Sequence, residues 1–140
     1  MLAVLNEALR EYPPVTIGLP RTAPRGGGVV DGNPVPEGWA INHNKSYWTD
    51  PFKFAPERFL GDERYKTDQL DAMQPFGIGP RNCIGQNLAY AEMRLVLAKL
   101  VYNFDMRLAD EARGWLDGQK AYTSWVKRPL PIYMTPAVRE

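Results

Sequence analysis

The chain has 140 residues, of which 44% are hydrophobic and 24% are charged, as in an ordinary globular domain. Its 17 basic and 16 acidic residues are scattered and leave a net charge of +1, so no electrostatic footprint for a nucleic acid is present. One cysteine and one histidine can form neither an internal disulfide nor a four-ligand structural zinc site, which excludes both kinds of scaffold.

The amino-terminal residues 1–11 predict an amphipathic helix, because three leucines recur along one stripe. Glu7 and Arg10 lie on the other side with the spacing of a helical ion pair, and from their positions alone they form a solvated pair. The two prolines that follow end the helix. Residues 15–41 are rich in proline and glycine and contain short β-favouring pieces, which predicts a small antiparallel hairpin.

Residues 42–73 show neither a helical nor a strand period, and we expect an irregular segment that its own aromatic side chains pack in place. These aromatic residues are Tyr47, Trp48, Phe52, Phe54, Phe59 and Tyr65. The same segment contains His43, which we predict to be a surface or turn residue rather than a metal ligand, because no partner ligands accompany it.

The strongest predicted helix covers residues 84–104 and is apolar over most of its circumference, so we expect it to be buried. Charged residues interrupt it, and no run of about 18 uncharged apolar residues could span a bilayer. Short strands are predicted at 105–108, 122–126 and 132–134. We therefore expect no membrane anchor in this chain, and its amino terminus lacks the pattern of a secretory signal.

The candidate chemistry is concentrated in residues 76–85, which present the only cysteine in a glycine-rich loop before the predicted helix. Unpaired backbone N–H groups and the positive end of the helix dipole favour an anion there, and Arg81 adds a positive charge. Gly85 leaves room for a flat ligand near the sulfur, and Phe76 can lie against the sulfur and exclude water. Cys83 is therefore a candidate metal ligand, although a lone cysteine that opens a helix is more often an inert buried residue.

This loop resembles the haem-thiolate signature F-x-x-G-x-R-x-C-x-G of the cytochrome P-450 monooxygenases. Its fixed positions are occupied here by Phe76, Gly79, Arg81, Cys83 and Gly85. The resemblance implies that Cys83 is the axial ligand of the iron of haem b and that the other four residues belong to the cofactor-binding loop.

Two further segments resemble the family, namely an E-x-x-R helix motif and a P-E-R-F segment. In this chain they contribute Glu7, Arg10 and Arg58, which the resemblance implies form a charge triad for folding and haem retention. If the triad is buried, the loss of one member leaves the others uncompensated. Arg21, after the first predicted strand, matches a family position that reaches a haem propionate, and Arg81 is a second candidate for that role.

The implied fold is mainly α with small antiparallel β-sheets (α+β), and residues 1–140 are expected to form the carboxyl-terminal, haem-binding portion of a single P-450 domain. The amino-terminal portion, with most of the substrate pocket and any membrane anchor, is expected upstream. The motif spellings look most like those of filamentous-fungal members in secondary metabolism. The full-length protein is then expected at the cytosolic face of the endoplasmic reticulum membrane.

The implied activity is insertion of one oxygen atom of O2 into a small apolar substrate. Terpenoids and polyketides are the candidate substrate classes. The implied partner is NADPH-cytochrome P-450 reductase, which supplies electrons from NADPH. The isolated chain is expected to be inactive, because one haem face would be open to water. Two alternatives stay open: a truncated non-catalytic remnant with weak or no haem binding, and a reductase-independent haem-thiolate isomerase or peroxygenase.

Overall fold

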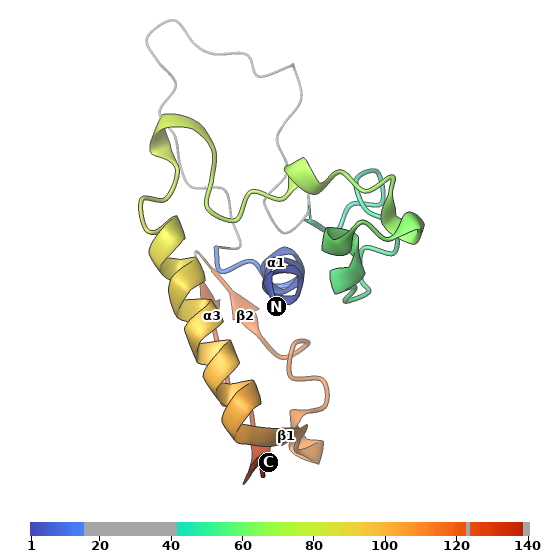
Figure 1. Ribbon diagram of the computed structural model, residues 1–140. Helices are drawn as coiled ribbons and strands as arrows, with labels where there is room; N and C mark the ends of the chain where they lie inside the picture. The colour runs from blue at the N-terminus through green and yellow to red at the C-terminus, as the bar shows by residue number, and fades with distance from the viewer. Residues whose placement is uncertain (16–41, 123, 139–140) are drawn as a thin grey trace, which may run out of the picture.

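The computed structural model describes residues 1–15, 42–122 and 124–138 (Figure 1). The predicted hairpin over 15–41 lies outside the described residues except for its first residue, Val15, which forms an isolated antiparallel bridge with Ser124. Arg21 also lies outside them. In the described part, helices combine with small antiparallel sheets, as the α+β prediction requires.

Helix α1 (Leu2–Glu11) confirms the first predicted helix and is the best-buried element. It lies between helix α3 and a segment of short turns (Figure 1). Its buried residues include Leu5 and Leu9 on the apolar stripe, and also Glu7 and Arg10. The interpretation of Glu7 and Arg10 as a solvated pair is therefore wrong, because the segment after residue 42 covers the charged side of the helix.

The segment 42–73 is irregular, as predicted, and is built from turns and three short 3-10 helices. These are η1 (Pro56–Leu60), η2 (Glu63–Tyr65) and η3 (Leu70–Ala72). The aromatic side chains of this segment differ in burial, and Tyr47 and Phe59 are half-buried. Trp48 and Tyr65 are buried, whereas Phe52 and Phe54 are 65% and 49% exposed, so the expected packing holds for only part of the set.

His43 lies in a turn, one of the two predicted alternatives, but it is buried rather than at the surface. Its ring contacts Phe52, with 5.3 Å between the centroids. Its Nε2 lies 3.5 Å from the Glu11 carboxylate at the end of α1. The polar partner on α1 gives the imidazole a buried position that its local sequence does not indicate.

Helix α3 (Gln86–Asn103) confirms the strongest predicted helix but not its predicted burial. None of its residues is buried, and Leu88 and Leu95 are 64% and 57% exposed. An apolar helix becomes buried only where other elements cover it. In the described part of the chain, α1 and strand β1 are its principal neighbours, and they leave most of its circumference open (Figure 1).

The two sheets are antiparallel pairs that follow α3. Strand β1 (Phe104–Leu108) pairs with β4 (Ile132–Pro136), so the first and last predicted strands are confirmed. Between them, η5 (Asp110–Ala112) leads to β2 (Lys120–Ala121), which pairs with β3 (Trp125–Val126). The predicted strand at 122–126 is confirmed only at its end, as β3, whose partner β2 precedes the predicted range.

Candidate functional site

The cysteine loop, residues 76–85, folds back on itself ahead of α3. The Cys83 amide donates a hydrogen bond to the Phe76 carbonyl at 2.7 Å, and the Asn82 amide donates to the Gly79 carbonyl at 3.0 Å. Gly77 and Gly79 have φ of 74° and 77°, a left-handed conformation that glycine adopts without steric penalty. The glycines therefore permit the turns that bring the two ends of the loop together.

Cys83 is exposed, and its position differs slightly from the prediction. The helix begins at Gln86 with Gly85 as its N-cap, so Cys83 precedes α3 rather than opening it. An added Cβ on Gly85 would lie 3.7 Å from the Cys83 sulfur, which places this glycine against the thiol. The approach to the sulfur on that side is open because position 85 carries no side chain.

Phe76 and Arg81 are the other two members of the loop with described surroundings. The ring of Phe76 contacts Tyr90 of α3, with 5.3 Å between the centroids. Arg81 is exposed at the end of η4 (Gly79–Arg81), and its guanidinium has no hydrogen-bond or ion-pair partner among the described residues. A guanidinium in this setting can make charge-assisted hydrogen bonds to a carboxylate.

The donor set at the loop suits a prosthetic group better than a bare metal ion. No group of three or more His, Cys, Asp or Glu that could hold an ion is found in the described ranges. Cys83 supplies a single soft ligand, and haem iron needs only one such ligand from the protein because the macrocycle brings four of its own. The open side at Gly85 also leaves space for a flat group, so the residues present fit haem.

A buried ion cluster, Glu7, Arg10 and Arg58, joins α1 to η1. Glu7 accepts two hydrogen bonds from Arg10, both at 2.9 Å, and one from Arg58 Nε at 3.3 Å. The Ala55 amide also donates to Glu7, at 2.8 Å. The three charged residues are 0%, 0% and 2% exposed, so the structure brings together the triad expected from the E-x-x-R and P-E-R-F segments.

Two further carboxylates belong to this region, and the sequence motifs do not indicate either of them. Glu11 accepts a hydrogen bond from Arg10 at 2.7 Å, and Asp68 forms an ion pair with Arg58. Asp68 lies ten residues beyond Arg58 in an irregular segment, so no periodicity could have found it. Adjacency to Arg10 was the only available signal for Glu11.

Backbone carbonyls and aromatic rings complete the surroundings of the two arginines. Arg10 donates to the carbonyls of Asn42 and Pro51 at 2.6 and 2.8 Å. Its guanidinium lies 5.4 Å from the centroid of Trp48, and that of Arg58 lies 4.3 Å from Tyr65. These rings pack on cations that already have hydrogen-bond partners, which adds cation–π stabilisation.

Burial by itself would raise the pKa of the Glu11 carboxyl, but the hydrogen bond from His43 and the charge of Arg10 outweigh it. The resulting pKa of Glu11 lies below its ordinary value of 4.5. The carboxyl is therefore ionised at neutral pH and remains a partner for Arg10.

The sequence model of the cytochrome P-450 family matches residues 1–135. The chain belongs to the cytochrome P-450 family. It is 54% identical over 143 residues to cytochrome P-450 monooxygenase tpeC of Talaromyces stipitatus, covering 97% of this chain and 28% of that protein. It is 51% identical over 144 residues to trichothecene C-15 hydroxylase of Fusarium sporotrichioides, covering 97% of this chain and 29% of that protein.

Among solved structures, retinoic acid-bound cyanobacterial CYP120A1 matches with a TM-score of 0.67 at 29% identity. The match covers 96% of this P-450 chain and 32% of the cyanobacterial one. The chain therefore spans about three tenths of the length of the relatives it matches. The resemblance to fungal secondary-metabolism members and the expected fold class are confirmed, and the family's cofactor is haem.

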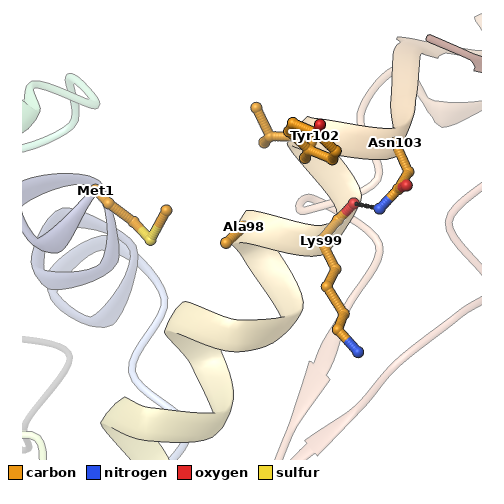
Figure 2. A pocket seen from close by; sticks show the side chains of 6 residues that line it. Met1, Ala98, Lys99, Tyr102 and Asn103 are labelled. Atoms are coloured by element: carbon orange, nitrogen blue, oxygen red, sulfur yellow. Dashed lines mark hydrogen bonds between the residues drawn. The ribbon is translucent and has the colours of Figure 1, made fainter. Parts of the chain in front are cut away.

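An open groove lies away from the cysteine loop, where the start of α1 faces the carboxyl-terminal end of α3 (Figure 2). It is lined by Met1, Ala98, Lys99, Val101, Tyr102 and Asn103. Asn103 donates a hydrogen bond to the Lys99 carbonyl at 2.7 Å, which holds the last turn of the helix. The lining is mostly hydrocarbon and shares no residue with the loop 76–85.

Within the described ranges, no helix has both the length and the hydropathy needed to cross a bilayer.

Proposed function

We propose that this protein is a haem-thiolate monooxygenase, with residues 1–140 supplying the haem-binding portion of its fold. The observation that carries the proposal is the exposed thiol of Cys83 on a closed glycine loop, with Gly85 against its sulfur. A single accessible sulfur beside an open approach is the arrangement that an axial ligand of haem requires. The family membership of the chain supports the same assignment.

The proposed roles follow from where the side chains lie. The Cys83 sulfur would hold the iron of haem b, and Gly85 would leave room for the macrocycle. The exposed guanidinium of Arg81, together with Arg21, would bind haem carboxylates through charge-assisted hydrogen bonds. Phe76 and Gly79 would keep the shape of the loop, because the Phe76 carbonyl and the Gly79 turn hold its two ends.

The buried ion cluster is proposed to act at a distance from the reacting atoms. Its charges hold η1 on α1, and Asn6 of α1 accepts a hydrogen bond from Tyr90 on the second turn of α3. Glu7, Arg10 and Arg58 would therefore support folding and haem retention rather than touch the substrate. Haem with a thiolate ligand supplies O2 activation when bound, because the electron-rich sulfur favours O–O cleavage.

The proposed reaction is hydroxylation of a small apolar substrate with one oxygen atom of O2. Electrons would come from NADPH through NADPH-cytochrome P-450 reductase. The hydroxylase among the fungal relatives supports this reaction class and, with the fungal spelling of the motifs, a substrate among terpenoid or polyketide metabolites. The proposed location is the cytosolic face of the endoplasmic reticulum membrane.

The test is the carbon monoxide difference spectrum of the reduced, haem-loaded protein. Wild-type protein is expected to give the Soret band typical of thiolate ligation, and Cys83→Ser is expected to abolish it. His43→Gln is the matched control, because it removes the only histidine and should leave the thiolate band intact. Survival of that band in Cys83→Ser, or its loss in His43→Gln alone, would overturn the proposed ligand. Turnover with NADPH and reductase, rather than with peroxide alone, would support the monooxygenase assignment.

A further inference from the structure

Tyr90, on the second turn of α3, contacts two segments that are far apart in the sequence. Its hydroxyl donates a hydrogen bond to Asn6 Oδ1 of α1 at 2.9 Å. Its ring contacts Phe76 of the cysteine loop, with 5.3 Å between the centroids and 48° between the planes. A single side chain therefore connects α1 to the cysteine loop.

The α1 end of this connection is firmly held. Asn6 is the residue before Glu7, whose carboxylate is buried among Arg10, Arg58 and the Ala55 amide. The position of Asn6 is thus fixed by the same interactions that hold η1 on α1. A hydrogen bond to Asn6 ties α3 to the most completely buried part of the described structure.

The loop end of the connection leads directly to the thiol. Phe76 carries the carbonyl that accepts the 2.7 Å hydrogen bond from the Cys83 amide. A shift of the Phe76 ring would move this carbonyl and with it the residue that bears the sulfur. Arg94, one turn further along α3, places its guanidinium 5.7 Å from the centroid of the Tyr90 ring on the same helix.

We propose that Tyr90 is a positioning residue that, through Asn6 and Phe76, fixes the cysteine loop on α1 and so orients the Cys83 sulfur. The consequence for haem rests on the proposed function, whereas the consequence for the loop does not. Burial raises the pKa of the Tyr90 phenol, so the hydroxyl stays a donor at neutral pH. Loss of the Tyr90 hydroxyl should loosen the cysteine loop, because the Tyr90 ring is the aromatic neighbour of Phe76 in the described part of the chain.

The direct test is amide hydrogen exchange at Cys83 in Tyr90→Phe, in Asn6→Ala and in the double variant. Tyr90→Phe removes only the hydroxyl and keeps the ring on Phe76. A net hydrogen bond of ordinary strength corresponds to about a two- to tenfold change in an opening equilibrium, so each single variant should exchange faster by that factor. The double variant should exchange no faster than the singles, because both changes remove the same bond.

The matched control is Tyr133→Phe, on strand β4, whose hydroxyl has no hydrogen-bond partner among the described residues. It should leave exchange at Cys83 unchanged. Amides of the β1–β4 ladder should exchange at the wild-type rate in every variant. If Tyr90 only stabilised the fold as a whole, its loss would accelerate exchange at these amides as well. Unchanged exchange at Cys83, additive effects in the double variant, or a uniform acceleration across the chain would overturn the proposal. Asn6→Ala keeps the test available if Tyr90→Phe does not fold.

A second readout concerns haem. Haem-loaded Tyr90→Phe should transfer its haem to an excess of apomyoglobin about two- to tenfold faster than wild type, and Tyr133→Phe should not. This outcome is separable from the proposed function. If Cys83→Ser keeps the thiolate band, the ligand assignment fails while the exchange coupling can still hold. If Cys83→Ser loses the band but Tyr90→Phe changes neither exchange nor haem transfer, only the positioning role fails.

Discussion

Replacing Glu7 with alanine removes the acceptor that holds both arginines of the buried ion cluster. The carboxylate accepts hydrogen bonds from Arg10, Arg58 and the Ala55 amide, and it is fully buried. After the substitution the two guanidiniums stay buried with less compensating charge. Water cannot easily replace the carboxylate, because the neighbouring ring of Trp48 is also buried.

The expected loss can be estimated from this geometry. Removing one partner of a buried, hydrogen-bonded ion pair costs about 3–5 kcal/mol, which is a large share of a domain stability of roughly 5–15 kcal/mol. For two-state unfolding of a chain of this size, that loss corresponds to a fall of roughly 10–17 °C in Tm. Glu11 and Asp68 still compensate part of the charge, which favours the lower half of the range.

The assay is urea denaturation followed by tryptophan fluorescence, supported by thermal unfolding. The matched control is Glu63→Ala, which removes another acidic partner at the i,i+3 spacing, in the exposed pair with Lys66 at 3.1 Å. The free energy of unfolding should fall strongly for Glu7→Ala and stay within error of wild type for the control. Equal effects of the two substitutions would show that burial does not account for the contribution of the cluster to stability.

Two further outcomes are expected from the site and its surroundings. Gly85→Val should keep the free energy of unfolding near that of wild type but slow alkylation of the Cys83 thiol and weaken haem uptake, because a Cβ at position 85 would lie 3.7 Å from the sulfur. Wild-type rates of alkylation and haem uptake in this variant would contradict this geometry. The pKa of Glu11 is lowered in the folded state, so its ionised form stabilises the protein above its ordinary pKa of 4.5, and this contribution is lost as pH falls through the lower folded value. Glu11→Gln should therefore lose less stability than wild type on acidification below about pH 5, and parallel stability–pH curves would show that Glu11 is not responsible.

The local features of the fold could be predicted from the sequence because they depend on short-range patterns. Helix α1 follows from its leucine stripe and from the proline pair that ends it, and helix α3 follows from its apolar run. Each of these patterns extends over only a few helical turns. The cysteine loop could be predicted for the same reason, since its glycines and its thiol lie within ten residues.

The features that local patterns do not predict depend on contacts between distant segments. From their spacing alone Glu7 and Arg10 look solvated, and only the family resemblance joins them to Arg58, which lies 51 residues beyond Glu7. The connection from Tyr90 to Asn6 spans 84 residues. Burial of α3 was predicted from its composition alone, whereas burial depends on which elements cover the helix.

The proposed function depends on a bond between the Cys83 sulfur and the iron of bound haem. X-ray absorption at the iron edge of the haem-loaded protein tests it most directly, because sulfur scatters differently from nitrogen and oxygen. Wild-type protein should show one sulfur neighbour of the iron and Cys83→Ser none. A sulfur neighbour that persists in Cys83→Ser, or its absence from the wild-type protein, would show that Cys83 is not the ligand.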